Sequence, residues 1–259
     1  MNKSNLLVLF DQDQRIDIEY PGMRREVTPN VVRHVATVAG EEGSLTYSRL
    51  DEIGAEAAIQ EQVDYFESLG QDFEWKLYDH DRPGDLKDRL VAHGFLVEEA
   101  EAVLVLDLQR APDLLWQPVK HDVRRIDDPQ KLFDVQSVEQ QVWDEDFSWI
   151  GLYLGSALRD KPEQMSVYVA YLDDRPVSTA WILFPTHGRF ASLWGGSTLS
   201  VARNQGLYTA LLAIRAQEAR ARHMRYLTVD ASPMSRPILE KFNFELIDWT
   251  YPYKWKRKA

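Results

Sequence analysis

The chain of 259 residues contains no cysteine. Disulfide bonds, thiol nucleophiles and zinc sites built on thiolates are therefore all excluded. Long apolar runs are lacking as well, since the N-terminal region holds only Leu6–Phe10, followed at once by Asp11 and Asp13. Such a run is too short for the core of a signal peptide and far too short to span a bilayer. We therefore expect a cytoplasmic protein with no membrane partner.

Basic residues are scarce relative to acidic ones. The chain has 30 Lys and Arg against 41 Asp and Glu, a formal net charge of −11. A general nucleic-acid binder needs a basic footprint, so this class is disfavoured. His121 and His187 are isolated and neither has metal-ligand spacing, so no metal is expected. Neither a phosphate-binding loop ending in Gly-Lys-Ser/Thr nor a Gly-x-Gly-x-x-Gly turn after a strand is found, which disfavours a nucleotide-binding protein.

The chain divides into two halves near residues 108–118. A strand-like run, Val103–Leu108, is followed by the segment Arg110–Pro118, which carries two prolines and is typical of a linker. Hydrophobic residues make up 44% and charged residues 27%, which is ordinary for a soluble globular protein with a sizeable core. We predict one domain over residues 1–110 and a second over 118–259.

Periodicity predicts a mixed α/β sheet of about six strands in the second half. The expected strands are 119–126, 166–171, 177–184, 189–198, 226–230 and 244–253, and the expected helices are 129–142, 149–158, 206–222 and 236–242.

The first half repeats the later part of this order. A strand at 31–38 is followed by a helix at 48–69, a strand at 73–78 and a helix at 83–92. Gly94-Phe95 then opens a strand pair that ends at Leu108, much as Asn243-Phe244 precedes the last strand of the second half. This recurrence indicates an internal duplication.

The most informative segment runs from Leu193 to Leu212 and predicts a strand, a short turn and a helix with glycine in its first turn. The first N–H groups of a helix lack intrahelical partners and carry the positive end of the helix dipole, so they bind phosphates readily. Gly206 has no Cβ, so the backbone can approach a pyrophosphate closely. Arg203 adds a forked cationic donor. A simple turn glycine and a solvated arginine are the alternative interpretation.

In this segment the sequence resembles the GNAT superfamily of N-acetyltransferases. The family's acetyl-CoA signature is Arg or Gln, two residues, Gly, one residue, then Gly or Ala, at the start of a helix that follows a strand. Arg203 and Gly206 match its first two fixed positions, and Tyr208 departs from the third, where the family has a small residue. The departure requires the ring to point away from the phosphates, or the loop to be slightly wider.

A second segment, 235–244, resembles the family's late helix, which ends in Gly-Phe before the last strand. The resemblance covers residues 118–255 well and 27–108 faintly. It implies the acyl-CoA N-acyltransferase (GNAT) fold, an α/β mixed sheet, with two GNAT-like units in tandem and a degenerate N-terminal half. The N-terminal segment Glu41–Leu45 offers no basic residue to meet phosphates.

The resemblance also implies a co-substrate site and a mechanism. The strand before the signature splays from the strand after the helix, and pantetheine lies between them. Gly195-Gly196 is compatible with a bulge that helps this splay. Backbone donors near Leu199 and Val201 would hold the pantetheine and thioester, and those of Gln205 to Thr209 the pyrophosphate. The acetyl-CoA-binding residues expected are Leu199, Val201, Arg203, Asn204, Gln205, Gly206, Leu207, Tyr208 and Thr209.

The groups that move protons are less evident. The family often has a tyrosine on the late helix that protonates the departing thiolate, and Leu239 occupies that position here. Ser232 and Ser235 are the substitutes we consider catalytic, although a serine there equally caps a helix. The acidic turn Asp144–Asp146 could accept the proton of an amine, or be a solvated loop. Trp143, Trp149, Trp181 and Trp194 could line an acceptor pocket or belong to the core.

Two functions therefore stay open. The first is an N-acetyltransferase in which the amine of a small molecule or peptide attacks acetyl-CoA directly, in a ternary complex. The second is a catalytically silent acyl-CoA-binding sensor, for which Leu239 is the best argument. Neither the acceptor nor the oligomeric state follows from the sequence.

Overall fold

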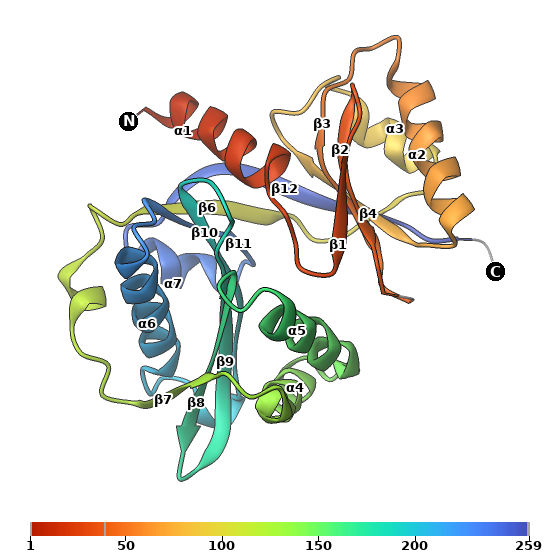
Figure 1. Cartoon of the computed structure of the whole chain (residues 1–259). Helices are drawn as coiled ribbons and strands as arrows, with labels where there is room; N and C mark the ends of the chain where they lie inside the picture. The colour runs from red at the N-terminus through yellow and green to blue at the C-terminus, as the bar shows by residue number, and fades with distance from the viewer. Residues whose placement is uncertain (1, 39, 258–259) are drawn as a thin grey trace. The chain divides into compact units, whose positions relative to one another are not determined.

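The computed structural model describes residues 2–38 and 40–257 (Figure 1). Its contacts define two compact units. The first contains Met1–Leu104, Asp230–Ile238 and Leu246–Ala259, and the second contains Val105–Val229 and Leu239–Glu245. The C-terminal strand thus returns to the unit that begins the chain. The domain boundaries expected from the sequence, 1–110 and 118–259, stay a prediction.

The first unit is a sheet with the strand order β1-β2-β3-β4-β12, in which β5 also pairs with β12. Strand β12 contributes residues to both units. The elements are α1 (Lys3–Phe10), the π-helix η1 (Asp11–Ile16), β1 (Met23–Val27), β2 (Val31–Ala36), β3 (Gly43–Ser48), α2 (Ala55–Leu69), β4 (Phe73–Tyr78), α3 (Leu86–Ala92), β5 (Leu96–Val97) and β12 (Glu245–Trp255).

The core of the first unit is formed by the apolar stripe of α2 and one face of the sheet. Ile59, Val63 and Phe66 recur at helical spacing and are buried, as the periodicity predicts. The rings of Phe66 and Phe73 stack with their centroids 4.3 Å apart. Each such large side chain contributes about 1.5–3 kcal/mol on burial. The helix ends at Gly70, whose φ of 67° suits a residue without a Cβ.

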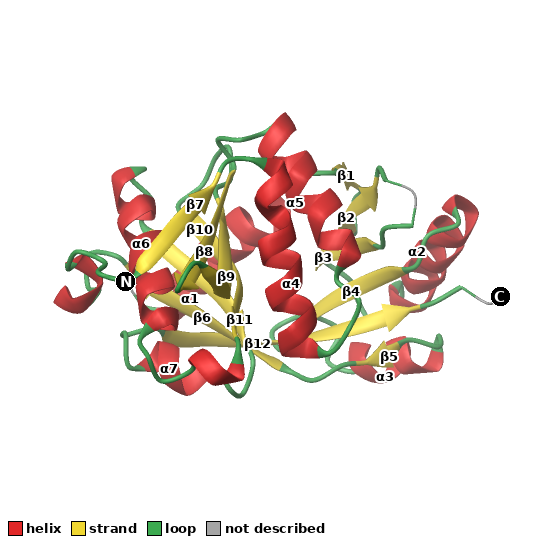
Figure 2. Ribbon diagram, turned by 90° about the horizontal axis from the view of Figure 1, so that it is seen from below, coloured by secondary structure: helices red, strands yellow, loops and turns green. Residues whose placement is uncertain are grey.

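The second unit is a sheet in the order β11-β10-β9-β8-β7. Helices α4 and α5 cover one face and α6 covers the other (Figure 2). Three elements contribute residues to both units, namely β6 (Glu101–Asp107), β11 (Tyr226–Ala231) and α7 (Arg236–Glu240). The other elements are the 3-10 helices η2 (Asp113–Trp116), η3 (Pro129–Lys131) and η4 (Ser200–Ala202), β7 (Asp122–Ile126), α4 (Leu132–Trp143), α5 (Ser148–Asp160), β8 (Met165–Leu172), β9 (Arg175–Leu183), β10 (Phe190–Thr198) and α6 (Leu207–Ala221).

The two units repeat one motif, as the sequence predicts. Helices α2 and α6 both have 15 residues. The strands flanking each helix pair in parallel, β3 with β4 and β10 with β11. A residue with positive φ then precedes a buried phenylalanine in each unit, Gly94 at 87° and Asn243 at 65°. Asn tolerates this left-handed conformation better than most residues, which explains the Asn in place of Gly.

Two expectations for the first half need correction. The helix expected at 48–69 begins only at Ala55, and residues 43–48 form strand β3. The segment Glu41–Leu45 therefore leads into and begins a strand rather than meeting a helix start, and the turn before α2 is at residues 49–54. Helix α1 and the π-helix η1 were not expected, because the first residues lack an amphipathic repeat. None of the described helices is long and apolar enough to cross a bilayer.

Candidate functional site

A split between two parallel strands is the central feature of the second unit. Strands β10 and β11 pair only from Phe190 to Ser192, opposite Tyr226 to Thr228, among the residues described. The register of β10 against β9 then shifts between Gly195 and Ser197, so the expected bulge is present. A Cβ on Gly195 would lie 2.4 Å from the ring of Trp181. Only glycine fits there, because the side chain of Trp181 is buried against it.

The loop after β10 reaches α6 through two residues in the left-handed region. Asn204 has φ 60° and Gly206 has φ 79°. The first bond of α6 runs from the N–H of Ala210 to the carbonyl of Gly206 at 2.9 Å. The N–H groups of residues 207–209 precede that bond, and the N-cap residue, Gly206, has no side chain with which to cap the helix. These groups are therefore available to an anion, since a helix start leaves its first donors without intrahelical partners.

Two cationic or potentially cationic side chains flank this loop. Arg203 is exposed and its Nε donates to the carbonyl of Thr198 at 3.2 Å, which leaves its Nη groups free to meet a ligand. His121 donates from Nε2 to the carbonyl of Gln205 at 2.9 Å. Its ring lies 3.3 Å from where a Cβ of Gly206 would be. No sequence pattern linked His121 to this loop, because His121 precedes β7 and lies far from Gln205 in the sequence.

The ring of Tyr208 lies against the bulge of β10. Its ring lies 3.3 Å from the position of a Cβ on Gly196, next to the bulge. Burial raises the pKa of Tyr208, and the nearby Arg215 opposes that shift. Arg215 itself is buried, which lowers its pKa to about 10, and it donates to the carbonyls of Trp181 and Trp194 at 3.2 Å each. Residue 208 thus fills space beside the split, where the signature has a small residue.

Leu199 and Val201 are the two remaining residues whose backbone was expected to hold the pantetheine and thioester. The N–H of Leu199 already donates to the carbonyl of Val177 at 2.9 Å. Val201 lies in the short helix η4 with its side chain 83% exposed. The N–H of Leu199 would have to give up its bond to Val177 before it could donate to a ligand.

The expected proton donors form a local cap. The hydroxyls of Ser232 and Ser235 lie 3.2 Å apart, and the N–H of Ser235 donates to Ser232 Oγ at 3.3 Å. This pattern is that of serines at a helix start, before α7. Leu239 on α7 is 1% exposed and is a core residue.

The acidic turn also acts as a cap. Asp146 accepts from the N–H of Ser148 at 2.8 Å and from its hydroxyl at 3.1 Å, at the start of α5. A different carboxylate, which the sequence did not single out, lies deeper. Glu139 of α4 is 2% exposed and accepts from Thr179 Oγ1 at 2.5 Å and Ser197 Oγ at 2.6 Å. Trp143 Nε1 adds a third bond at 3.1 Å. In the sequence, a single Glu within a helical pattern looks like an ordinary solvent-facing residue, so the burial of Glu139 could not be predicted.

The first unit has the same strand arrangement but different occupants. Strands β3 and β4 pair from Gly43 to Leu45, opposite Phe73 to Trp75. Just past that pairing, Arg15 donates from Nε to the carbonyl of Thr46 at 3.0 Å, and its Nη2 bonds both oxygens of Asp81 at 2.7 and 2.8 Å. Before α2, one carboxylate oxygen of Asp51 accepts from the N–H groups of Ile53 and Gly54.

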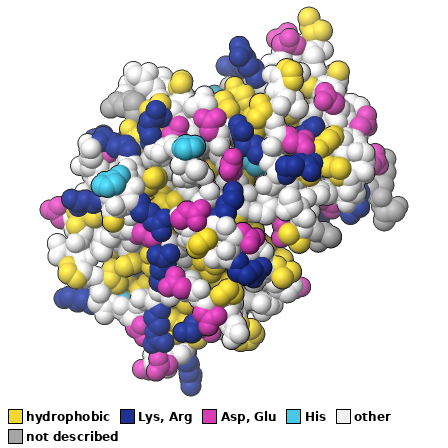
Figure 3. Space-filling model, in the orientation of Figure 1, with side chains coloured by type: hydrophobic (Ala, Val, Ile, Leu, Met, Phe, Trp, Pro, Cys, Tyr) yellow, Lys and Arg dark blue, Asp and Glu magenta, His cyan; other side chains and the backbone are white. Residues whose placement is uncertain are grey.

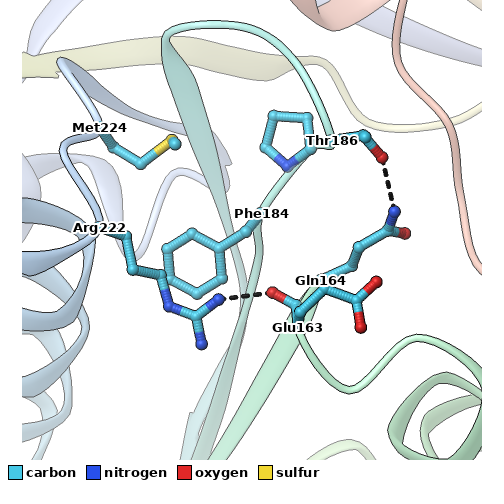
Figure 4. Close-up of a pocket in the computed structure, with 7 residues that line it drawn as sticks. Glu163, Gln164, Phe184, Thr186, Arg222 and Met224 are labelled. Atoms are coloured by element: carbon cyan, nitrogen blue, oxygen red, sulfur yellow. Dashed lines mark hydrogen bonds between the residues drawn. The ribbon is translucent and has the colours of Figure 1, made fainter.

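A cavity of about 310 Å³ lies at the other end of α6 (Figure 4). It is lined by Phe184, Met224 and Arg222, among others, and Gln164 donates to Thr186 at its rim. Because α6 has 15 residues, its two ends are about 22 Å apart. The cavity is therefore separate from the loop at Gly206, and we give it no part in the site.

The charges visible on the surface do not gather by sign. On the face shown in Figure 3, basic and acidic side chains are interspersed. No continuous basic footprint for a nucleic acid is visible on that face. Among residues 2–38 and 40–257, no group of three or more His, Asp or Glu could hold a metal ion.

Solved structures with the same architecture exist, at low sequence identity. A GCN5-related N-acetyltransferase from Kribbella flavida superposes with a TM-score of 0.67 at 14% identity, over 99% of this chain and 95% of that one. The chain has the GNAT fold. A tandem GNAT protein from the clavulanic acid biosynthesis pathway matches with a TM-score of 0.62 at 11% identity, over 93% of this chain and 86% of that one.

A third structure with the GNAT fold, a GCN5-related N-acetyltransferase from Sphaerobacter thermophilus, has a TM-score of 0.57 at 12% identity and covers 89% of this chain and 81% of that one. No family model matches the sequence, and no curated protein matches it either. The GNAT fold, including its tandem form, thus agrees with the fold that the signature around Arg203 and Gly206 predicted.

Proposed function

We propose that the protein is an N-acetyltransferase that moves an acetyl group from acetyl-CoA to a primary amine of a small molecule or peptide. One observation carries this proposal. Strand β10 separates from β11 after Ser192, carries the glycine bulge between Gly195 and Ser197, and leads into a loop that ends at the start of α6, whose first turn contains no acidic residue. Such a helix start binds a pyrophosphate, and Arg203 and His121 add donors beside it.

In this proposal acetyl-CoA binds along the split, with its pyrophosphate at the N–H groups of Gln205 to Thr209. The amine then attacks the thioester directly within a ternary complex. The chain has no cysteine, so it offers no thiol for a covalent acyl intermediate of that kind. Holding both reactants in one unit would supply the proximity on which such a transfer depends.

A second candidate is a catalytically silent acyl-CoA-binding sensor. It is favoured by Leu239, which is buried where the family often has a proton-donating tyrosine. Ser232 and Ser235 bond to each other as a cap, which weakens their proposed catalytic role. A thiol has a pKa of about 8.5, however, so its thiolate leaves tolerably well without a protein acid.

Calorimetric titration with acetyl-CoA tests the shared part of both candidates. We expect a dissociation constant in the range of about 1–100 μM. Acetyl transfer to a panel of primary amines, followed by release of CoA, then separates them. Binding without turnover on any amine would support the sensor, and absence of binding would remove the assignment of the loop at Gly206.

A further inference from the structure

The face of the second unit's sheet that is covered by α4 holds the buried carboxylate of Glu139, which has no cationic partner among residues 2–38 and 40–257. In the described part of the chain, the hydrogen-bond donors to Glu139 are all neutral, namely the hydroxyls of Thr179 and Ser197 and the indole of Trp143. Burying a carboxylate without a counter-charge is costly, and well-packed apolar residues usually serve stability at least as well. Stability alone therefore does not explain a buried carboxylate at this position, which indicates a functional role.

The hydrogen-bonded network of Glu139, Ser197 and Trp143 leaves room for another donor. A carboxylate offers about four lone-pair sites. Oε2 accepts from Ser197 and Trp143, whereas Oε1 accepts only from Thr179. Ser197 Oγ also accepts from Trp143 Nε1 at 3.1 Å and so keeps one acceptor site of its own. The network can thus take up an additional proton donor at Ser197.

The network lies beyond the point where β10 and β11 separate, on the part of β10 that pairs with β9. Ser197 is the residue at which the register of β10 shifts, directly after Gly196. Trp143, which bonds both Glu139 and Ser197, is 50% exposed. The carboxylate is therefore buried but connected, through one hydroxyl and one indole, to the bulge and to the surface.

We propose that Glu139, acting through Ser197, takes the proton that an acceptor ammonium must lose before its nitrogen can attack, an inference that rests on the proposed acetyl transfer. An N–H bond of the ammonium breaks as a new Oγ–H bond forms on Ser197. The original hydroxyl proton of Ser197 passes to Oε2 of Glu139. The amine is left neutral with its lone pair free, and the carboxylate becomes a carboxylic acid.

Other charged groups around α4 bond elsewhere. Asp134, on the same helix, accepts from the hydroxyl of Tyr171 on β8 at 2.6 Å. Asp146, in the turn after α4, caps α5, and Arg159 of α5 donates to Ser156 at 3.2 Å. Arg215 of α6 bonds carbonyls of β9 and β10. Glu139 is thus the carboxylate that contacts the bulge residue.

Asp134 provides a matched control for the test. Glu139→Gln and Asp134→Asn each replace a carboxylate of α4 that accepts from a hydroxyl by its amide. With benzylamine, spermidine and a lysine-containing peptide as acceptors, we expect Glu139→Gln to lower kcat/KM for the amine by about 100-fold or more near pH 7. Asp134→Asn should stay within about threefold of the wild type, and the acetyl-CoA affinity of both should stay within about twofold.

The pH profile separates a proton acceptor from a structural contact. Without Glu139 the enzyme depends on amine that is already neutral, so kcat/KM of Glu139→Gln should rise about tenfold per pH unit below the pKa of the amine. Ser197→Ala should show the same steeper slope. The wild type should show a flatter profile over the same range, because Glu139 takes the proton from the bound ammonium.

Three results would overturn the inference, and they are distinguishable. A wild-type protein that neither binds acetyl-CoA nor acetylates any of the three amines would remove the proposed function and this role with it. An active wild type with a parallel pH profile in Glu139→Gln would remove the role of Glu139 and leave the function standing. Loss of acetyl-CoA binding or of a cooperative unfolding transition in Glu139→Gln would assign Glu139 to the fold alone.

Discussion

The two units contain the same strand–helix–strand motif, but they treat the opening between the parallel strands in opposite ways. In the first unit, the guanidinium of Arg15 bonds the strand carbonyl of Thr46 and the carboxylate of Asp81. In the second unit, the corresponding strands β10 and β11 separate after Ser192 and lead to the loop at Gly206. Arg15, which belongs to the N-terminal segment of the chain, thus bonds β3 just beyond the point where the pairing of β3 with β4 ends.

The starts of α2 and α6 differ in the charge of the side chains beside them. The N–H groups of Ile53 and Gly54, before α2, bond the carboxylate of Asp51. The N-cap residue of both helices is a glycine without a capping side chain, but α2 has Glu56 in its first turn, whereas α6 has no acidic residue there and Arg203 and His121 lie nearby. The start of α2 thus has carboxylates beside it, whereas Arg203 lies beside the start of α6, an arrangement that suits the proposed binding of an external anion. One fold can therefore retain a motif as scaffold in one copy and as a candidate site in the other.

The largest effect is expected at Arg15. Arg15→Met leaves Asp81 as a buried, unpaired carboxylate, so the free energy of unfolding should fall by about 3–5 kcal/mol. Denaturation by guanidinium chloride measures this loss. Arg203→Met, an exposed arginine of the second unit, should change the free energy of unfolding by no more than about 0.5 kcal/mol. Equal losses for the two variants would contradict the view that the first opening is filled by a structural cation.

Gly206→Glu should weaken acetyl-CoA binding by about 100-fold or more, which corresponds to at least ~2.7 kcal/mol. The new side chain would place negative charge where phosphates are proposed to bind, and φ at Gly206 is 79°, which strains any other residue. Calorimetry gives the affinity, and circular dichroism shows whether the fold is kept. The matched variant Gly54→Glu, at the start of α2, should change the affinity by less than about twofold. An unchanged affinity in folded Gly206→Glu would remove the proposed site.

The free energy of unfolding should also depend on pH through His80 of the first unit. The ring nitrogens of His80 bond Asp11 at 2.9 Å and Asp248 at 2.5 Å. Burial opposes the charge, but these hydrogen bonds outweigh it and raise the pKa of His80 to about 9. Because the folded pKa lies above the unfolded value of about 6.5, the stabilisation is fully present below pH ~6.5 and is lost as the pH rises through about 9.

The loss between those pH values should be on the order of 2 kcal/mol, allowing for the partial exposure of His80. Chemical denaturation at a series of pH values measures it, and His80→Gln should flatten the dependence. A variant that keeps the full dependence would show that other groups produce it.

The smallest effect is expected at Tyr208, whose ring fills space against Gly196 beside the split. Tyr208→Ala should tighten acetyl-CoA binding by about tenfold, or ~1.4 kcal/mol, because the ligand no longer has to displace the ring. Tyr208→Phe keeps the ring and should bind like the wild type. Weaker binding by the alanine variant would show instead that the ring supports the ligand.

Much of the fold could be predicted from local patterns. The stripe of Ile59, Val63 and Phe66 predicted a packed helix, and Gly195-Gly196 predicted the bulge that the register of β10 confirms. The recurrence before Phe95 and Phe244 predicted the repeat. These features depend on residues close together in the chain, so the sequence displays them directly.

The sequence by itself thus determined the GNAT fold, its tandem form and the position of the candidate loop. Only the tertiary structure decided which groups meet there and which do not. It placed His121 on Gln205, Arg15 on Thr46 and Glu139 on Ser197, contacts between segments far apart in the chain. Long-range contacts of polar side chains follow no period in the sequence, because burial and hydrogen bonding select them only once strands and helices have packed.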